Sequence, residues 1–248
     1  MKTNRCRIIV VFASTILLFV FCQTATADPP EMPGNHGVPG LLAEVAELRA
    51  QIAELEAIIQ GYENFAPVPR TGQSQCYDSS GSATGCENTG QDGELGKGVP
   101  WPTPRFTDNL DGTVTDNLTG LIWLKDADCF GEQTWFNALS VCETLASSAC
   151  GLTDGSVAGD WRLPNVRELQ SLIDFGFYEP ALPNTAGTGK WSEGNPFTGV
   201  LSNSYWSSTT YEQTTYSAWH MYMYIGRASY GVKTDYIGYH VWPVRNAN

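Results

Sequence analysis

Aromatic rings with polar edges gather in the last part of the chain. Residues 205–248 hold eight of the 11 tyrosines and three of the eight tryptophans, but only two acidic side chains, Glu212 and Asp235. A tyrosine ring offers an apolar face to a sugar ring and a hydroxyl to its polar edge, at a low cost in side-chain entropy. This composition predicts a surface that binds carbohydrate or another neutral partner.

Strand-like alternation over residues 219–225 divides these side chains between two faces. One face, which we expect in the core, carries Trp219, Met221, Met223 and Ile225. The other face and the adjoining loops form the predicted ligand surface, which comprises His220, Tyr222, Tyr224, Arg227, Tyr211, Tyr230 and Tyr236. The alternative is that these tyrosines only cover a second layer of the fold, because tyrosine is common in strands.

Catalytic chemistry is not favoured by the residues present. A Ser-His-Asp arrangement would need His220 or His240, and the chain has no Gly-x-Ser-x-Gly elbow. Asp126 and Asp128 form the closest acidic pair, but a catalytic acid needs burial, and solvated loop acids are the favoured interpretation. The sequence therefore predicts no catalytic residue and no enzyme, with a carboxylate pair for glycoside hydrolysis left as an alternative.

No metal site or cofactor is predicted either. Residues 108–112 are similar to the opening of an EF-hand loop, yet the acid at its first position and the closing glutamate are missing. A hairpin turn explains these residues better. A structural calcium ion in an acidic loop is left as an alternative.

Five of the seven cysteines follow the predicted signal segment and should pair in an oxidising compartment. Cys76 and Cys86 flank a polar turn whose ends meet naturally. Cys142 lies on a helical apolar stripe and is predicted to be a buried free thiol. Cys129 and Cys150 are then left as the second disulfide. Metal ligation is the alternative, but the chain has no Cys-x-x-Cys motif.

Residues 1–27 have the pattern of a secretory signal peptide. Three basic residues precede an apolar run at 8–21, and Ala25-Thr26-Ala27 offers a small-x-small cleavage site. The run is shorter than the roughly 20 residues that span a bilayer, although a single anchor and lipid attachment at Cys22 are alternatives. We expect export to the periplasm, the cell surface or the medium, without membrane insertion after cleavage.

A heptad pattern follows the Pro/Gly-rich linker at residues 28–40. Within residues 41–62, β-branched residues take the a positions and leucines the d positions, as in Val45, Leu48 and Ile52. This pattern is typical of parallel coiled coils and predicts self-association as a dimer or trimer. One amphipathic helix packed on its own domain is the alternative.

The remaining chain is predicted to be a connector at residues 63–98 and a domain at residues 99–248. Short strands at 105–108 and 113–116 should form a hairpin, and a buried strand is expected at 121–124. Two helices should follow, one over 134–147 with Thr134 as N-cap, and one from the capping box of Asn165 and Glu168 to Gly176. Beyond residue 204 we expect strands and turns. The predicted fold class is α+β.

The charge balance excludes one class of partner. After residue 27 the chain carries 11 Lys and Arg against 26 Asp and Glu, a balance of −15. So acidic a surface repels phosphate backbones, and nucleic-acid binding is therefore not expected.

Four ordered blocks, at residues 108–123, 160–169, 205–210 and 241–245, resemble the C-terminal domain family of collagen-like bacterial adhesins, the Lcl C-terminal domain. The resemblance covers residues 70–248. It implies an exported bacterial domain with a C-type-lectin-like fold, two helices with short antiparallel sheets, preceded here by the coiled-coil-like helix. It also implies distant similarity to formylglycine-generating enzymes, but their late cysteines have no counterpart beyond Cys150.

The sequence thus predicts an exported, non-catalytic binding module that recognises a glycan or a surface protein, as an adhesin does. The alternative is a structural, oligomeric component of the envelope whose tyrosine-rich face is an assembly interface.

Overall fold

The computed structural model describes residues 43–54, 68–235 and 239–247. The chain divides into two compact units, Met1–Ala57 and Ile58–Asn248. In the first unit, residues 43–54 form a helix whose heptad side chains, Val45, Leu48 and Ile52, are all exposed. The signal segment, the linker at 28–40 and the rest of the predicted heptad stretch lie outside the described residues.

The second unit contains many strands and few helices. In chain order its elements are β1 (Cys76–Tyr77), β2 (Ala83–Thr84), α2 (Asp92–Leu95), β3 (Phe106–Asp108), β4 (Thr113–Asp116), β5 (Leu121–Leu124), α3 (Trp135–Thr144), α4 (Val166–Ser171), β6 (Ser204–Thr210), β7 (Ser217–Tyr222), β8 (Arg227–Val232), β9 (Tyr239–His240) and β10 (Val244–Asn246). The mixture of helices and sheets confirms the α+β class.

The first of two four-stranded sheets has the order β10-β5-β4-β3, with all neighbours antiparallel. The predicted hairpin is confirmed, since β3 and β4 pair from Phe106 opposite Asp116 to Asp108 opposite Val114. Asp111 shapes the turn by accepting hydrogen bonds from the backbone and hydroxyl of Thr113. The C-terminal strand β10 pairs with β5 and forms one edge of the sheet.

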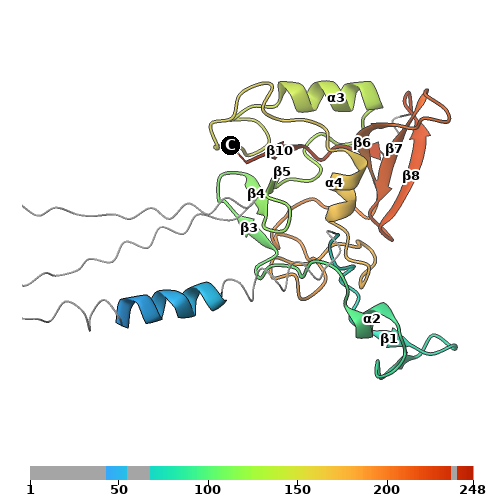
Figure 1. Ribbon diagram of the computed structural model, residues 1–248. Helices are drawn as coiled ribbons and strands as arrows, with labels where there is room; N and C mark the ends of the chain where they lie inside the picture. Colours follow the sequence, from blue (N-terminus) through green and yellow to red (C-terminus); the bar gives the residue numbers. More distant parts are fainter. Residues whose placement is uncertain (1–42, 55–67, 236–238, 248) are drawn as a thin grey trace, which may run out of the picture. The chain divides into compact units, whose positions relative to one another are not determined.

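The second sheet has the order β8-β7-β6-β9, and Figure 1 shows β6, β7 and β8 side by side. β7 pairs with β6 and β8 in antiparallel fashion, whereas β9 runs parallel to β6. The register along β7 and β8 is continuous from Ser217 opposite Val232 to Tyr222 opposite Arg227. This long hairpin therefore fixes which side chains share each face.

Both helices begin at the predicted caps but end earlier than predicted. Thr134 caps α3, and Asn165 with Glu168 forms a complete capping box at α4. Arg162, which precedes α4 in the chain, stabilises the capping box at the start of α4. Its guanidinium donates two hydrogen bonds of 2.7 Å to the Glu168 carboxylate.

The predicted ends at residue 147 and at Gly176 are wrong. α3 stops at Thr144 and α4 at Ser171. The residues just after α4, Leu172 and Ile173, are buried in the main core. The helix therefore ends with Leu172 as its C-cap, four residues before the predicted glycine cap, and the Leu172 side chain lies in the core.

Two apolar clusters pack on opposite faces of the second sheet. Met221 belongs to the larger cluster, together with Leu169 of α4 and Trp123 of the first sheet. Ala218, which lies three residues earlier on β7 and hence on the other face, belongs to a cluster with residues of α3. The sheet is thus covered on both sides, and Figure 1 shows α4 between the two sheets.

Both predicted disulfides are confirmed. Cys76 is bonded to Cys86, and Cys129 to Cys150, while Cys142 is a buried free cysteine. Burial raises the pKa of the Cys142 thiol, which therefore stays protonated. The first bond ties the small β1–β2 hairpin, and the second brackets α3.

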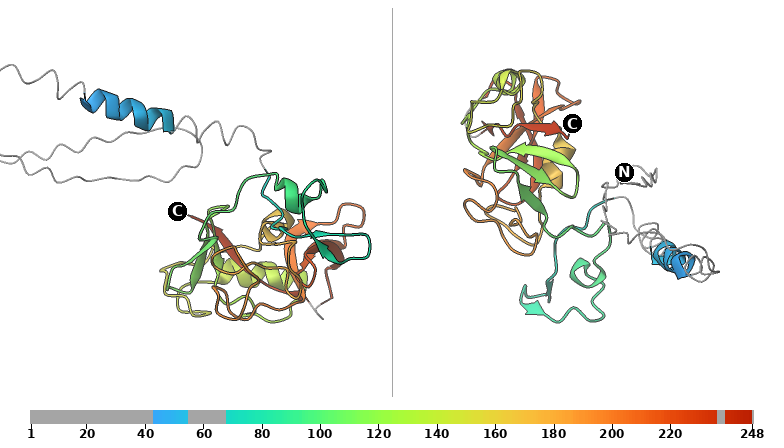
Figure 2. Two further views of the ribbon diagram at one scale, coloured as in Figure 1. Left: turned by 90° about the horizontal axis from the view of Figure 1, so that it is seen from below. Right: turned by 90° about the vertical axis from the view of Figure 1, so that its left-hand side faces the viewer.

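The connector is anchored to the domain near Asp174. Phe175 donates a backbone hydrogen bond of 2.8 Å to the Thr71 carbonyl, and a Cβ at Gly72 would collide with the Asp174 carboxylate. Burial raises the pKa of Asp174 to about 6. Figure 2 shows the β1–β2 hairpin and α2 projecting from the rest of this unit. Among the described residues, no helix has the length and apolarity needed to cross a bilayer.

Candidate binding surface

The end of the β7–β8 hairpin brings three predicted site residues together. Tyr222 and Arg227 face each other across the strands, with the guanidinium carbon 5.8 Å from the ring centroid. The rings of Tyr222 and Tyr224 are nearly parallel, with centroids 5.8 Å apart and an interplanar angle of 18°. Both rings are half-buried, so each keeps part of its surface in solvent.

Two further residues extend this set, and the sequence did not indicate either of them. The ring of Tyr178 lies 6.3 Å from that of Tyr224 and is 63% exposed. The ammonium group of Lys190 lies 5.5 Å from the Tyr178 centroid. We call the set Lys190, Tyr178, Tyr224, Tyr222 and Arg227 the tyrosine row. It carries a cation at each end.

Backbone hydrogen bonds hold Tyr178 in its place. The N–H group of Glu179 donates to the carbonyl of Tyr224 at 2.7 Å. The N–H group of Ala181 donates to the carbonyl of Met223, also at 2.7 Å. The segment before the second sheet is thereby fixed alongside the hairpin end. No local pattern reveals this contact, because more than 40 residues separate the two segments. A solitary tyrosine two residues before Pro180 was the only signal in the sequence.

The remaining predicted aromatic residues form a second group. The rings of Tyr211 and Tyr230 are stacked at 4.1 Å, and Trp219 meets both at steep angles, at 5.1 and 6.3 Å. We call these three residues the Trp219 cluster. Trp219 and Tyr222 are three positions apart on β7, so the cluster and the row lie on opposite faces of the hairpin.

The single surface predicted from alternation is therefore wrong in its geometry. Trp219 is half-buried within an aromatic cluster, and Ile225 is 44% exposed, although both were expected in the core. The predicted burial of Met221 and Met223 is confirmed. Tyr236 lies outside the described residues.

His220 is the clearest correction among the site residues. It shares a face with Tyr222, but only 6% of its surface is exposed. Its ring packs 5.0 Å from that of Tyr239 and 6.0 Å from that of Trp206. Burial lowers the pKa of His220 to about 4, so the ring is neutral at pH 7. A buried, neutral ring cannot contact a ligand on the surface.

The other buried histidine, His240, is held by neighbouring side chains. Its Nδ1 lies 2.6 Å from a carboxylate oxygen of Asp128, and its Nε2 lies 3.4 Å from the Asn203 amide. Both ring nitrogens thus have protein partners, and the pair links β9 to the loop after β5. Within the described ranges, no three His, Cys, Asp or Glu side chains are placed to hold a metal ion together.

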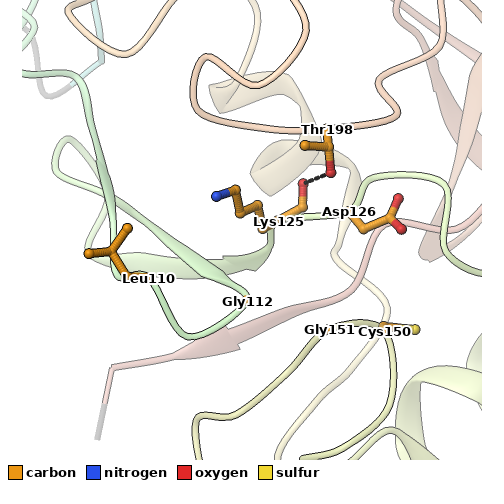
Figure 3. A pocket seen from close by; sticks show the side chains of 7 residues that line it. All are labelled: Leu110, Gly112, Lys125, Asp126, Cys150, Gly151 and Thr198. Carbon is orange, nitrogen blue, oxygen red and sulfur yellow. Dashed lines mark hydrogen bonds between the residues drawn. The ribbon is translucent and has the colours of Figure 1, made fainter.

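A shallow pocket of about 410 Å³ lies beside the β3–β4 turn (Figure 3). Figure 3 shows the side chains of Lys125 and Asp126 pointing in opposite directions. Lys125 is already paired with Asp108 at 2.6 Å, and the Thr198 hydroxyl donates to the Lys125 carbonyl. The pocket therefore offers few converging polar groups, and the tyrosine row is the better candidate site.

Comparison with known proteins gives one match. The family model described as the Lcl C-terminal domain matches residues 112–245, which include all residues of both aromatic groups and the Cys129–Cys150 disulfide. No curated protein and no solved structure matches the chain.

Proposed function

Because the chain belongs to the Lcl C-terminal domain family, a family of exported bacterial domains, we propose that it is an exported, non-catalytic module that binds carbohydrate through the tyrosine row. The two disulfides fit the oxidising compartment that this role requires. The proposal includes the C-type-lectin-like arrangement that the sequence resemblance implies, and a location in the periplasm, at the cell surface or outside the cell.

The observation that carries the proposal is the row itself. Three tyrosine rings follow one another at 5.8 and 6.3 Å, and the outermost is mostly exposed. The stacked contact of Tyr222 with Tyr224 and the edge-on contact of Tyr224 with Tyr178 limit the motion of these rings before a ligand arrives, so less side-chain entropy remains to be lost on binding. A sugar chain could lie along the rings with its hydroxyl groups reaching the tyrosine hydroxyls and the two cations.

Electrostatics favour this part of the molecule for a neutral or weakly charged partner. The chain has a net charge of −12, yet the row ends in Lys190 and Arg227. Glu179 is the acidic residue adjacent to the row in the chain, and it is exposed. The row itself therefore carries two cations and no acidic side chain.

The proposed module also associates through its N-terminal helix, as a dimer or trimer. Val45, Leu48 and Ile52 are 42%, 43% and 53% exposed in the single chain. Their heptad spacing is that of a coiled-coil seam, and a second helix would cover it. Association would place several tyrosine rows on one particle and increase the avidity for a repeating glycan.

A glycan array probed with the full-length chain tests the proposal. We expect binding that is lost in the double variant Tyr222→Ala, Tyr224→Ala. The matched control is Tyr216→Ala, since Tyr216 is 65% exposed and precedes the opposite end of β7. Melting temperatures of all three proteins separate lost contacts from lost folding.

Two outcomes would contradict the proposal. If the folded double variant binds glycans as well as the parent chain does, the row is not the site. If the double variant instead loses self-association, the row is an assembly interface, as expected of a structural envelope component. Repeating the array with a chelator shows whether calcium takes part.

A further inference from the structure

A second pocket, of about 300 Å³, lies where the connector meets the rest of the second unit. Residues 70–101 supply all of its lining except Gly187. The family match begins only at residue 112, so it covers little of this lining. The pocket is therefore a feature of this chain's own connector, and membership of the family does not imply it.

Two lining glycines lie so close to their neighbours that the walls are fixed before a ligand arrives. A Cβ at Gly93 would lie 3.0 Å from the Sγ of Cys76, which is held in a disulfide. A Cβ at Gly187 would lie 2.8 Å from the Cβ of Arg105, a residue with no exposed surface. Because the backbone of these walls is already ordered, binding need not pay for ordering it.

Trp101 provides one flat, apolar wall of the pocket. Its indole N–H donates a hydrogen bond of 3.0 Å to the Arg70 carbonyl. The guanidinium carbon of buried Arg105 lies 5.0 Å from the centroid of its ring. The ring is half-buried and so keeps part of its surface in solvent. A fixed aromatic ring of this kind suits the apolar face of a sugar ring.

Polar groups surround this ring. The Thr71 hydroxyl donates a hydrogen bond to the Asp92 carboxylate and accepts one of 3.2 Å from the backbone N–H of Gln73. A carboxylate has about four acceptor positions, so Asp92 can accept hydrogen bonds from a ligand as well. The side chains of Gln73 and Ser74 add an amide and a hydroxyl to the lining, and both groups donate and accept. Such a set matches sugar hydroxyls, which also donate and accept.

The composition of the lining argues against other classes of ligand. Among the lining residues, the apolar side chains are Pro100 and Trp101, whereas sites for lipids are lined mostly by apolar groups. Arg70 and Asp92 carry opposite charges, so the lining has no net charge to attract an ion. A zwitterion such as an amino acid would need both charges shielded from water, but Arg70 is exposed. The volume is at the small end for ligand sites, which suits a single ring.

We propose that this pocket binds one neutral sugar residue, which stacks on Trp101 and donates hydroxyl hydrogen bonds to Asp92. It is a second carbohydrate site, and it is argued from its own lining. The proposal therefore does not rest on the tyrosine row.

Fluorine NMR of the full-length chain labelled with fluorotryptophan tests the pocket. The chain has eight tryptophans, and the signal that disappears in Trp101→Phe is that of Trp101. The probes are the methyl glycosides of glucose, galactose, mannose and N-acetylglucosamine. At least one should shift the Trp101 signal, with a dissociation constant of about 1 to 10 mM for so small a ligand. The signal of Trp123, which has no exposed surface, should not move.

Two results of this titration would overturn the proposal. One is a Trp101 signal that does not move with any of the glycosides at about 50 mM, because so weak an affinity does not amount to a site. The other is a shift with free glycine or serine but with none of the glycosides, which would indicate an amino-acid site. The Trp101 signal reports on this pocket and not on the tyrosine row, so the two carbohydrate sites can fail independently.

Two matched variants locate the bound sugar. Gln73→Ala removes an amide that lines the pocket, and the affinity should fall about fivefold, the typical net effect of one hydrogen bond. Gln75→Ala removes an exposed amide outside the lining and should bind as the parent chain does. Both variants should keep the parent melting temperature, because neither side chain is buried. Equal affinities of the two variants would show that the sugar does not occupy the pocket, and would also overturn the proposal.

Discussion

The tyrosine row and the Trp219 cluster are built from the same kinds of residues on the same hairpin, but their contacts differ. In the cluster, each ring contacts the other two, with Tyr211 and Tyr230 stacked and Trp219 against both. In the row, rings contact only their neighbours, and the ends are cations. In the cluster, the rings contact one another, whereas in the open row part of the ring surface stays free for a ligand. This difference predicts stability effects for the cluster and binding effects for the row.

The largest effect on stability should come from Trp219. Trp219→Ala removes the ring that both neighbours contact, and we expect the free energy of unfolding to fall by about 3 kcal/mol. Urea titration followed by circular dichroism measures this change. Glycan binding by the folded fraction should persist, and its loss would show that the cluster belongs to the site.

The pH dependence of stability should identify His220 as a core residue on the face of the row. Its folded pKa of about 4 lies below the ordinary 6.5, so the unfolded chain takes up the proton first as pH falls. The stability relative to a His220→Asn variant should drop by about 1.4 kcal/mol per pH unit between these values. Chemical denaturation at pH 7, 6 and 5 measures the difference. An exposed ring would give no such slope.

Asp174 provides a control of opposite sign for this measurement. Its folded pKa, about 6, lies above the ordinary 3.8, so the folded chain takes up this proton before the unfolded chain does, and the Asp174 side chain adds to stability as pH falls. An Asp174→Asn variant should therefore show a steeper acid loss of stability than the parent chain. Comparing the pH dependence of stability in His220→Asn and Asp174→Asn separates the contribution of the histidine from that of the aspartate.

A moderate effect on binding with little effect on stability is expected for the exposed end of the row. Tyr178→Ala removes a ring that is 63% exposed, so the free energy of unfolding should change by no more than about 0.5 kcal/mol. Glycan affinity should fall about tenfold, because about 1.4 kcal/mol of stacking is lost. Isothermal titration against the best array glycan measures the affinity, and urea titration measures the free energy of unfolding. Unchanged affinity would limit the site to Tyr222 and Tyr224.

The smallest effect should follow the loss of one hydroxyl in the cluster. Tyr211→Phe removes the hydrogen bond that Tyr211 donates to the exposed Gln213, but it keeps the stacked ring. We expect changes below about 0.5 kcal/mol in stability and none in binding. A large loss of glycan binding would move the site from the row to the cluster and reverse the comparison.

Local features of the fold were predicted from local chemistry. Thr134 and the Asn165–Glu168 capping box mark the true helix starts, because a cap bonds to backbone groups within three residues. The helix ends were not predicted, since α4 ends at Ser171, just before the buried residues Leu172 and Ile173, and no local cap motif marks that position. The same contrast holds for the row. Tyr222 and Arg227 meet across a hairpin, whereas Tyr178 arrives through a contact that no short pattern encodes.

The sequence by itself determined the α+β class, the cysteine pairing, the hairpins and the presence of an aromatic, acid-poor C-terminal region, because each follows from composition or short-range spacing. Only the tertiary structure decided which of those aromatic residues reach solvent. Alternation assigns Trp219 and His220 to opposite faces, but it cannot say what covers each face. Apolar clusters pack against both faces of the second sheet, so burial of His220 and exposure of the row depend on distant segments.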